Sequence, residues 1–157
     1  MIKTNVMRIL TQKKIPHLEH EYPHEGGAVD GVTCAKLMGM EVQKVFKTLV
    51  TQGNGGYYVF VVPVAQTLDL KKAAKSVGEK AVHMIPQAQL EPLTGYVHGG
   101  CSPVGMKKAF PTVIDESCLA LETMVVSAGK IGYQIELSPQ ALLGLIRGKT
   151  ADLVADS

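Results

Sequence analysis

Two β-rich segments joined by a glycine-rich turn constrain the fold of this 157-residue chain more than any other feature. Residues 45–51 and 57–64 are rich in β-branched and aromatic side chains, and the residues between them, Gln52-Gly53-Asn54-Gly55-Gly56, tolerate positive φ. The pattern therefore predicts an antiparallel hairpin. Because residues 57–64 are apolar on both faces, we expect this strand to be buried within a larger sheet.

Shorter helices and strands are predicted on both sides of the hairpin. Apolar spacing and capping residues indicate helices near 2–13, 33–38, 69–78 and 138–146, and β-rich runs indicate strands at 18–22, 112–115, 123–127 and 133–137. The elements do not alternate strictly and no repeat is present, which favours an α+β fold with a mixed, largely antiparallel sheet flanked by helices. The length fits a single domain over residues 1–157, with a frayed tail expected from about residue 148.

The composition is that of a folded, water-soluble protein. Hydrophobic residues make up 46% of the chain and the formal net charge is +2, whereas disordered chains combine low hydrophobicity with high net charge. No apolar run approaches the roughly 20 residues that cross a bilayer. The N-terminus lacks the charged and apolar regions of a secretory signal. We therefore expect a cytoplasmic protein that does not contact a membrane.

The cysteines and histidines form no metal or disulfide pattern. Cys34, Cys101 and Cys118 are odd in number and widely spaced, which indicates a reducing compartment. His17 and His20 would point to opposite faces of an extended segment, so they would not ligate one ion together. The sequence thus predicts no metal site and no cofactor.

Positive charge is concentrated in the middle of the chain. Residues 44–108 contain eight lysines and three acidic residues, and Lys71, Lys72 and Lys75 share one side of the predicted helix 69–78. A basic face of this kind suits a phosphate-bearing ligand, of which a nucleic acid is the extreme case. An ordinary solvated helix surface explains the same pattern.

Lys47 is the first candidate for a chemical role. The two-residue period of a strand places it on the same face as Val45 and Leu49. Its ammonium group therefore either lies in a cleft, where burial disfavours the charged form, or extends over an exposed sheet face. The first reading makes Lys47 a site residue.

A glycine-rich segment at residues 94–108 is the second candidate. It contains Gly99-Gly100-Cys101-Ser102-Pro103, whose backbone N–H groups either bind an oxyanion or merely form a tight turn. A covalent role for Cys101 with His98 as base is a further possibility, although no orienting acid lies nearby in the sequence. The other two cysteines fit small buried residues.

Five segments, in order, resemble the YbaK/EbsC family of aminoacyl-tRNA deacylases, which is related to the editing domain of bacterial prolyl-tRNA synthetases. They are Phe46-Lys47-Thr48-Leu49-Val50, Leu68-Asp69-Leu70-Lys71-Lys72, Thr94-Gly95-Tyr96, Gly99-Gly100-x-Ser102-Pro103-x-Gly105-x-Lys107-Lys108 and Ser127-Ala128-Gly129-Lys130. The resemblance extends from the first predicted helix to about Leu143. It implies a barrel-like mixed sheet flanked by helices, in agreement with the α+β prediction.

The resemblance also implies a trans-editing hydrolase that removes cysteine from proline tRNA, and from cysteine tRNA as a second substrate. In this family the substrate thiol attacks its own ester carbonyl, while loop amides stabilise the oxyanion and a lysine positions the acyl-adenosine end. By motif position the catalytic residues are Lys47, Gly99, Gly100, Cys101 and Ser102, and the substrate-binding residues are Tyr22, Lys47, Pro103, Ser127 and Gln134. The basic residues expected to contact the acceptor end of proline tRNA are Lys71, Lys72, Lys75, Lys107 and Lys108.

Three points stay open at this stage. Some relatives carry an acid at the position of Gln134, which favours a polar contact there over an acid–base role. An Ala-tRNA(Pro) deacylase that uses a positioned water, and a non-catalytic module that binds aminoacyl-tRNA or a nucleotide, fit the same features. We expect prolyl-tRNA synthetase to supply tRNA specificity as a partner, and the sequence does not determine the oligomeric state.

Overall fold

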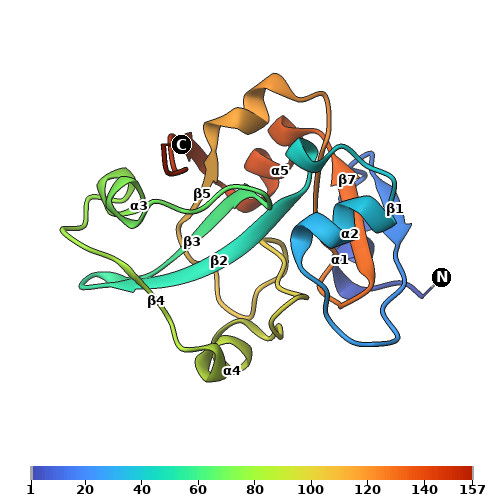
Figure 1. Ribbon diagram of the computed structural model, residues 1–157, viewed down its shortest axis with the longest axis horizontal. Helices are drawn as coiled ribbons and strands as arrows, with labels where there is room; N and C mark the ends of the chain where they lie inside the picture. The colour runs from blue at the N-terminus through green and yellow to red at the C-terminus, as the bar shows by residue number, and fades with distance from the viewer. Residues whose placement is uncertain (1, 157) are drawn as a thin grey trace.

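The computed structural model, which describes residues 2–156, contains two β-sheets that meet at a parallel bridge between Val45 and Val125 (Figure 1). The three-stranded sheet has the order β1 (Leu18–Glu21), β7 (Tyr133–Leu137), β6 (Met124–Ser127). The five-stranded sheet has the order β4 (His83–Met84), β2 (Phe46–Gly53), β3 (Gly56–Pro63), β5 (Thr112–Asp115), β8 (Lys149–Ala151).

The predicted hairpin is confirmed as the pair β2–β3. Its antiparallel register places Lys47 opposite Val62 and Gly53 opposite Gly56, and residues 59–62 of β3 are fully buried. The β3–β5 and β5–β8 pairs are parallel and the other four ladders are antiparallel, so the mixed α+β prediction is also confirmed. The sheets do not close on themselves, so the expected barrel-like form applies only loosely.

Helices cover both sheets. They are α1 (Asn5–Gln12), α2 (Gly31–Leu37), α3 (Leu70–Ser76), α4 (Leu90–Thr94) and α5 (Pro139–Ile146), with short 3-10 turns η1 (Val42–Lys44), η2 (Gln87–Gln89) and η3 (Glu116–Ala120). The side chains of Asp69 and Ser138 accept backbone N–H bonds at the starts of α3 and α5, as the sequence predicted. Within residues 2–156 no helix is long and apolar enough to cross a membrane.

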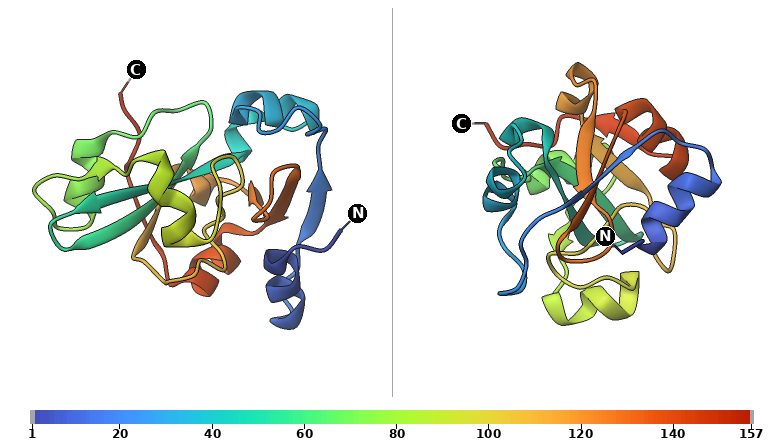
Figure 2. Two further views of the ribbon diagram at one scale, coloured as in Figure 1. Left: turned by 90° about the horizontal axis from the view of Figure 1, so that it is seen from below. Right: turned by 90° about the vertical axis from the view of Figure 1, so that its right-hand side faces the viewer.

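Two apolar clusters lie on opposite faces of the hairpin. Residues of α1 and α5 pack with Phe46 and Val50 in the larger cluster, and Ala73 and Ala74 of α3 pack with Phe60 in the smaller one. Figure 2 shows the hairpin at one end of the molecule and the blue N-terminal elements at the other. The region between these ends holds the site described below.

The expectation of a frayed tail is wrong for residues 149–156. Strand β8 pairs in parallel with β5, Leu153 is fully buried, and the Leu153 N–H donates to the carboxylate of Asp115. A tail that fills an open sheet edge and buries a leucine gains hydrogen bonds and apolar contact that its local sequence does not reveal.

Candidate active site

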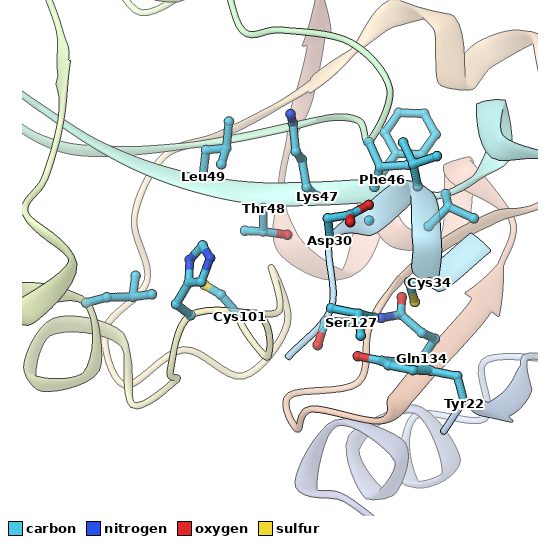
Figure 3. Close-up of a pocket in the computed structure, with 18 residues that line it drawn as sticks. Tyr22, Asp30, Cys34, Phe46, Lys47, Thr48, Leu49, Cys101, Ser127 and Gln134 are labelled. Atoms are coloured by element: carbon cyan, nitrogen blue, oxygen red, sulfur yellow. The ribbon is translucent and has the colours of Figure 1, made fainter. Parts of the chain in front are cut away.

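A cavity of about 410 Å³ lies where the two sheets meet, between α2, the first half of β2 and the glycine-rich loop (Figure 3). It brings together six residues predicted for the site from distant parts of the sequence: Tyr22, Lys47, Gly99, Cys101, Ser127 and Gln134. Tyr22 directly follows β1, Ser127 ends β6 and Gln134 lies on β7. The cavity therefore depends on the packing of one sheet against the other.

Three predicted loop residues do not line this cavity. Gly100 and Ser102 are buried and are not among its lining residues, and the Ser102 hydroxyl accepts the N–H of Val104. Pro103 lines a separate cavity of about 340 Å³ beside Ile9 and Phe110. The substrate contact predicted for Pro103 thus does not fall at the cavity that holds Lys47.

Lys47 is partly buried at the cavity, as the first reading of the sequence required. Burial lowers the pKa of its ammonium group, and within residues 2–156 the group has no ion pair or hydrogen bond. Lys47 and Thr48 extend from opposite sides of β2 in Figure 3, as alternation along a strand requires. The cavity thus has a cationic part on one side of β2 and a neutral polar part on the other.

The glycine-rich loop is held by close backbone packing. Gly99 has a φ of 87°, and a Cβ atom there would lie 2.6 Å from the Cβ of Ala28. A Cβ on Gly100 would lie 3.1 Å from the backbone nitrogen of Ile131, in the turn between β6 and β7. A side chain is thus excluded at Gly99, and one at Gly100 would require the β6–β7 turn to shift, so the glycines allow the loop backbone to pack against the other sheet.

The loop keeps backbone donors free. The Gly100 N–H donates to the carbonyl of Val97 and so is not available to a ligand. Among the hydrogen bonds of residues 2–156, none uses the N–H of Gly99, Cys101 or Ser102. The expected oxyanion site is therefore reduced to these three amides, of which Gly99 and Cys101 belong to residues that line the cavity.

The Cys101 side chain is unsuited to nucleophilic attack. The residue is 8% exposed, and burial raises the pKa of its thiol to about 12. The thiol is thus protonated at neutral pH, while the nucleophile in cysteine catalysis is the thiolate. Cys34, which also lines the cavity, has its thiol pKa raised to about 11 by burial, and Cys118 is fully buried in the core.

Two side-chain oxygens at the cavity have no hydrogen-bond partner in the described part of the chain: Thr48 Oγ1 and Gln134 Oε1. Gln134 is 7% exposed, and Figure 3 shows its amide extending toward Ser127 beside the side chain of Tyr22. Burial raises the pKa of Tyr22, so its phenol is neutral. A buried polar atom without a partner costs stability and indicates a place for a ligand group.

A second polar cluster, centred on Glu136 two residues after Gln134 on β7, has its hydrogen bonds filled by protein groups. The carboxylate of Glu136 is 2.8 Å from Lys44 Nζ and 2.8 Å from His20 Nε2, and it accepts the hydroxyl of Thr123. Burial favours the neutral acid, but the hydrogen bonds outweigh it and lower the pKa of Glu136 to about 2. This cluster joins β1, β7 and Thr123, the residue just before β6, to the turn that precedes β2.

The lysines expected to contact tRNA do not line the cavity. Lys72 is held by Asp152, by Asp156 and by the carbonyl of Val154, so the structure does not support it as a tRNA contact. The other four, Lys71, Lys75, Lys107 and Lys108, are exposed. Helix α3 packs against the face of β2 that carries Leu49, and by alternation Lys47 lies on that same face.

Sequence reasoning missed Asp30, Cys34 and Thr48 as cavity residues. Thr48 lies next to Lys47 in the motif that was recognised, and that adjacency was the one available signal. Within residues 2–156 no group of histidine, cysteine or acidic side chains is placed to hold a metal ion. The cavity lining offers the ammonium group of Lys47, the carboxylate of Asp30, the imidazole of His98, backbone amides and neutral polar groups.

Comparison with known proteins gives consistent results. The model of the aminoacyl-tRNA editing domain family matches residues 27–145. The chain is 47% identical over 152 residues to "Putative Cys-tRNA(Pro)/Cys-tRNA(Cys) deacylase EbsC" of Enterococcus faecalis, covering 96% of this chain and 93% of the relative. It is 27% identical over 116 residues to a proline–tRNA ligase of Thermosipho melanesiensis, covering 73% of this chain and 20% of the ligase. A solved structure described as "a putative trans-editing enzyme for prolyl tRNA synthetase" aligns with a TM-score of 0.84 at 26% identity, covering 99% of this chain and all of that one.

Proposed function

Because the chain belongs to the aminoacyl-tRNA editing domain family, we propose that it is a deacylase that hydrolyses cysteine esterified to proline tRNA. The observation that carries the proposal is Lys47, a partly buried ammonium group with no protein partner within residues 2–156, at a cavity large enough for an aminoacyl ester. An unpaired charge at such a place is costly unless a ligand compensates it. The phosphate and hydroxyl groups of a 3′-terminal adenosine supply that compensation.

The reaction proceeds through the substrate thiol. The cysteinyl thiolate attacks the ester carbonyl, the ribose hydroxyl leaves with a proton, and water then opens the resulting thiolactone to free cysteine. Negative charge develops on the carbonyl oxygen during the attack. Gly99 and Cys101 line the cavity, and we assign their N–H groups to this oxygen, a contact worth about 3 kcal/mol per donor.

Selectivity follows from this chemistry. Alanine has no thiol, and serine has a much weaker nucleophile, so neither ester is activated in the same way. A small cavity by itself distinguishes single groups by only about 1 to 3 kcal/mol.

The proposal is tested by hydrolysis of cysteinyl-, alanyl- and seryl-proline tRNA, with the Lys47→Ala variant and an enzyme-free blank in parallel. We expect rapid loss of cysteine alone, and a fall of at least 100-fold for Lys47→Ala in a variant whose circular dichroism matches wild type. A folded, fully active Lys47→Ala protein contradicts the proposal. Preference for alanine identifies the water-dependent sister activity, and binding without turnover identifies a regulatory module.

The path of the tRNA is part of the same proposal. Lys71 and Lys75 lie on α3 at the face of β2 that carries Lys47, and Lys107 and Lys108 follow the glycine-rich loop. We propose that these four exposed lysines contact the acceptor end and that prolyl-tRNA synthetase selects the tRNA. If adding the synthetase leaves the preference among different cysteinyl-tRNAs unchanged, the partnership is wrong.

A further inference from the structure

Thr48 Oγ1 and Gln134 Oε1, which have no hydrogen-bond partner within residues 2–156, have no role in the proposed attack of the substrate thiol on the ester. We propose that they bind the α-ammonium group of the aminoacyl ester, which deepens the proposed function and rests on it. They line the cavity from different sheets, Thr48 from β2 and Gln134 from β7. In Figure 3 the Thr48 hydroxyl lies on the side of β2 that faces Ser127 and Gln134.

The backbone of Thr48 adds a third acceptor. The carbonyl of Val50 accepts the N–H of Ile85, on the side of β2 that carries β4. Because carbonyls alternate along a strand, the Thr48 carbonyl points to that same side. On that edge β4 pairs only with Thr51 and Gln52 and β6 bridges only Val45, so neither ladder reaches Thr48, and no hydrogen bond within residues 2–156 uses its carbonyl.

This set of groups suits an ammonium group in particular. An α-ammonium carries three N–H donors and no acceptor, while the two carbonyl oxygens of Thr48 and Gln134 are acceptors and the Thr48 hydroxyl can accept as well. The exposed carboxylate of Asp30 lies at the cavity rim, where Thr33 donates to it and keeps its pKa low. Lys47, which would repel a second cation, extends from the opposite side of β2.

The arrangement orients the substrate. With the ammonium at Thr48 and the adenosine end at Lys47, the ester carbonyl lies between the two groups, near the free loop amides. A substrate that lacks the amino group would keep its thiol but lose this anchor. Thr48 and Gln134 are thus positioning residues for the proposed reaction, and they do not take part in bond making.

The test compares two esters of the same proline tRNA: cysteinyl, and 3-mercaptopropionyl, which lacks only the amino group. All rates are divided by the enzyme-free rate of the same ester, because the amino group also changes the intrinsic reactivity. We expect wild type to prefer the cysteinyl ester by about tenfold or more, and Thr48→Val to lose most of that preference. Thr48→Ser, which keeps the hydroxyl, should retain it.

Thr51→Val is the matched control. It removes a hydroxyl from the same strand, but that hydroxyl donates to the Tyr58 carbonyl and does not line the cavity. The control should keep the preference. Equal use of both esters by wild type, or an unchanged preference in a folded Thr48→Val protein, overturns the inference and leaves the proposed function standing. Absence of wild-type turnover on the cysteinyl ester overturns both.

Discussion

Gln134 and Glu136 share one face of β7, yet their side-chain oxygens differ in how many hydrogen bonds they accept. Glu136 has three hydrogen-bond donors around its carboxylate, whereas the amide oxygen of Gln134 has no partner in the described part of the chain. Both side chains are nearly as buried as the apolar core. The fully hydrogen-bonded carboxylate of Glu136 stabilises the contact between the two sheets. The amide oxygen of Gln134 lowers stability, at a cavity where a ligand can supply the missing hydrogen bond.

The largest expected effect on stability follows from removing the negative charge of Glu136. Glu136→Gln leaves Lys44 without its anionic partner in a partly buried site, and we expect the free energy of unfolding at pH 7 to fall by about 2 kcal/mol. Urea denaturation followed by circular dichroism measures the change. Asp156→Asn, which removes an exposed partner of Lys72, is the control and should leave the free energy of unfolding nearly unchanged.

The same carboxylate predicts a pH dependence. The pKa of Glu136 is about 2 in the folded protein and 4.5 for an ordinary glutamate, so folding favours the charged form. The stabilisation is therefore complete above pH 4.5 and is lost as the pH falls from 4.5 toward 2. We expect the stability difference between wild type and Glu136→Gln to shrink over this interval, and a constant difference would contradict the assigned hydrogen bonds.

Replacing Gln134 should change the free energy of unfolding in the opposite direction. Gln134→Leu removes a buried oxygen without a partner and keeps a similar volume, so we expect the unfolding free energy to rise by about 1 kcal/mol. The same change should reduce deacylation, because the substrate ammonium group loses one of its three proposed acceptors. Denaturation and turnover measured on one preparation test both parts. A variant that is less stable than wild type would show that Gln134 is a structural residue like its neighbour.

The smallest effect on activity is expected for replacement of Cys101. Because burial keeps its thiol protonated and only its backbone amide is assigned a role, Cys101→Ala should retain at least about half of the deacylase activity. Cys118→Ala, in the core and away from the cavity, is the matched control for loss of a buried thiol. A large loss of turnover in a folded Cys101→Ala protein would support a covalent mechanism instead.

Local rules explain which elements were predicted correctly. Some signals act within a few residues, so they can be read from the chain directly: the turn at residues 52–56, the caps Asp69 and Ser138, and the β-rich runs of β5 and β7. The ordered tail was missed because β8 is stabilised by β5, which lies far away in the sequence. The ion pairs of Lys72 with Asp152 and Asp156 were not foreseen for the same reason, since both acids lie on that tail.

The sequence by itself determined the α+β class, the hairpin that carries Lys47 and the glycine positions that shape the loop. The tertiary structure decided which predicted residues share one cavity, because Tyr22, Lys47 and Gln134 come from separate strands that approach only when the two sheets pack. It also decided which polar groups are left without partners. Whether a polar group is fully hydrogen-bonded depends on all its neighbours in space. Neither the three partners of Glu136 nor the lack of a partner for the Thr48 hydroxyl within residues 2–156 can therefore be read from residue order.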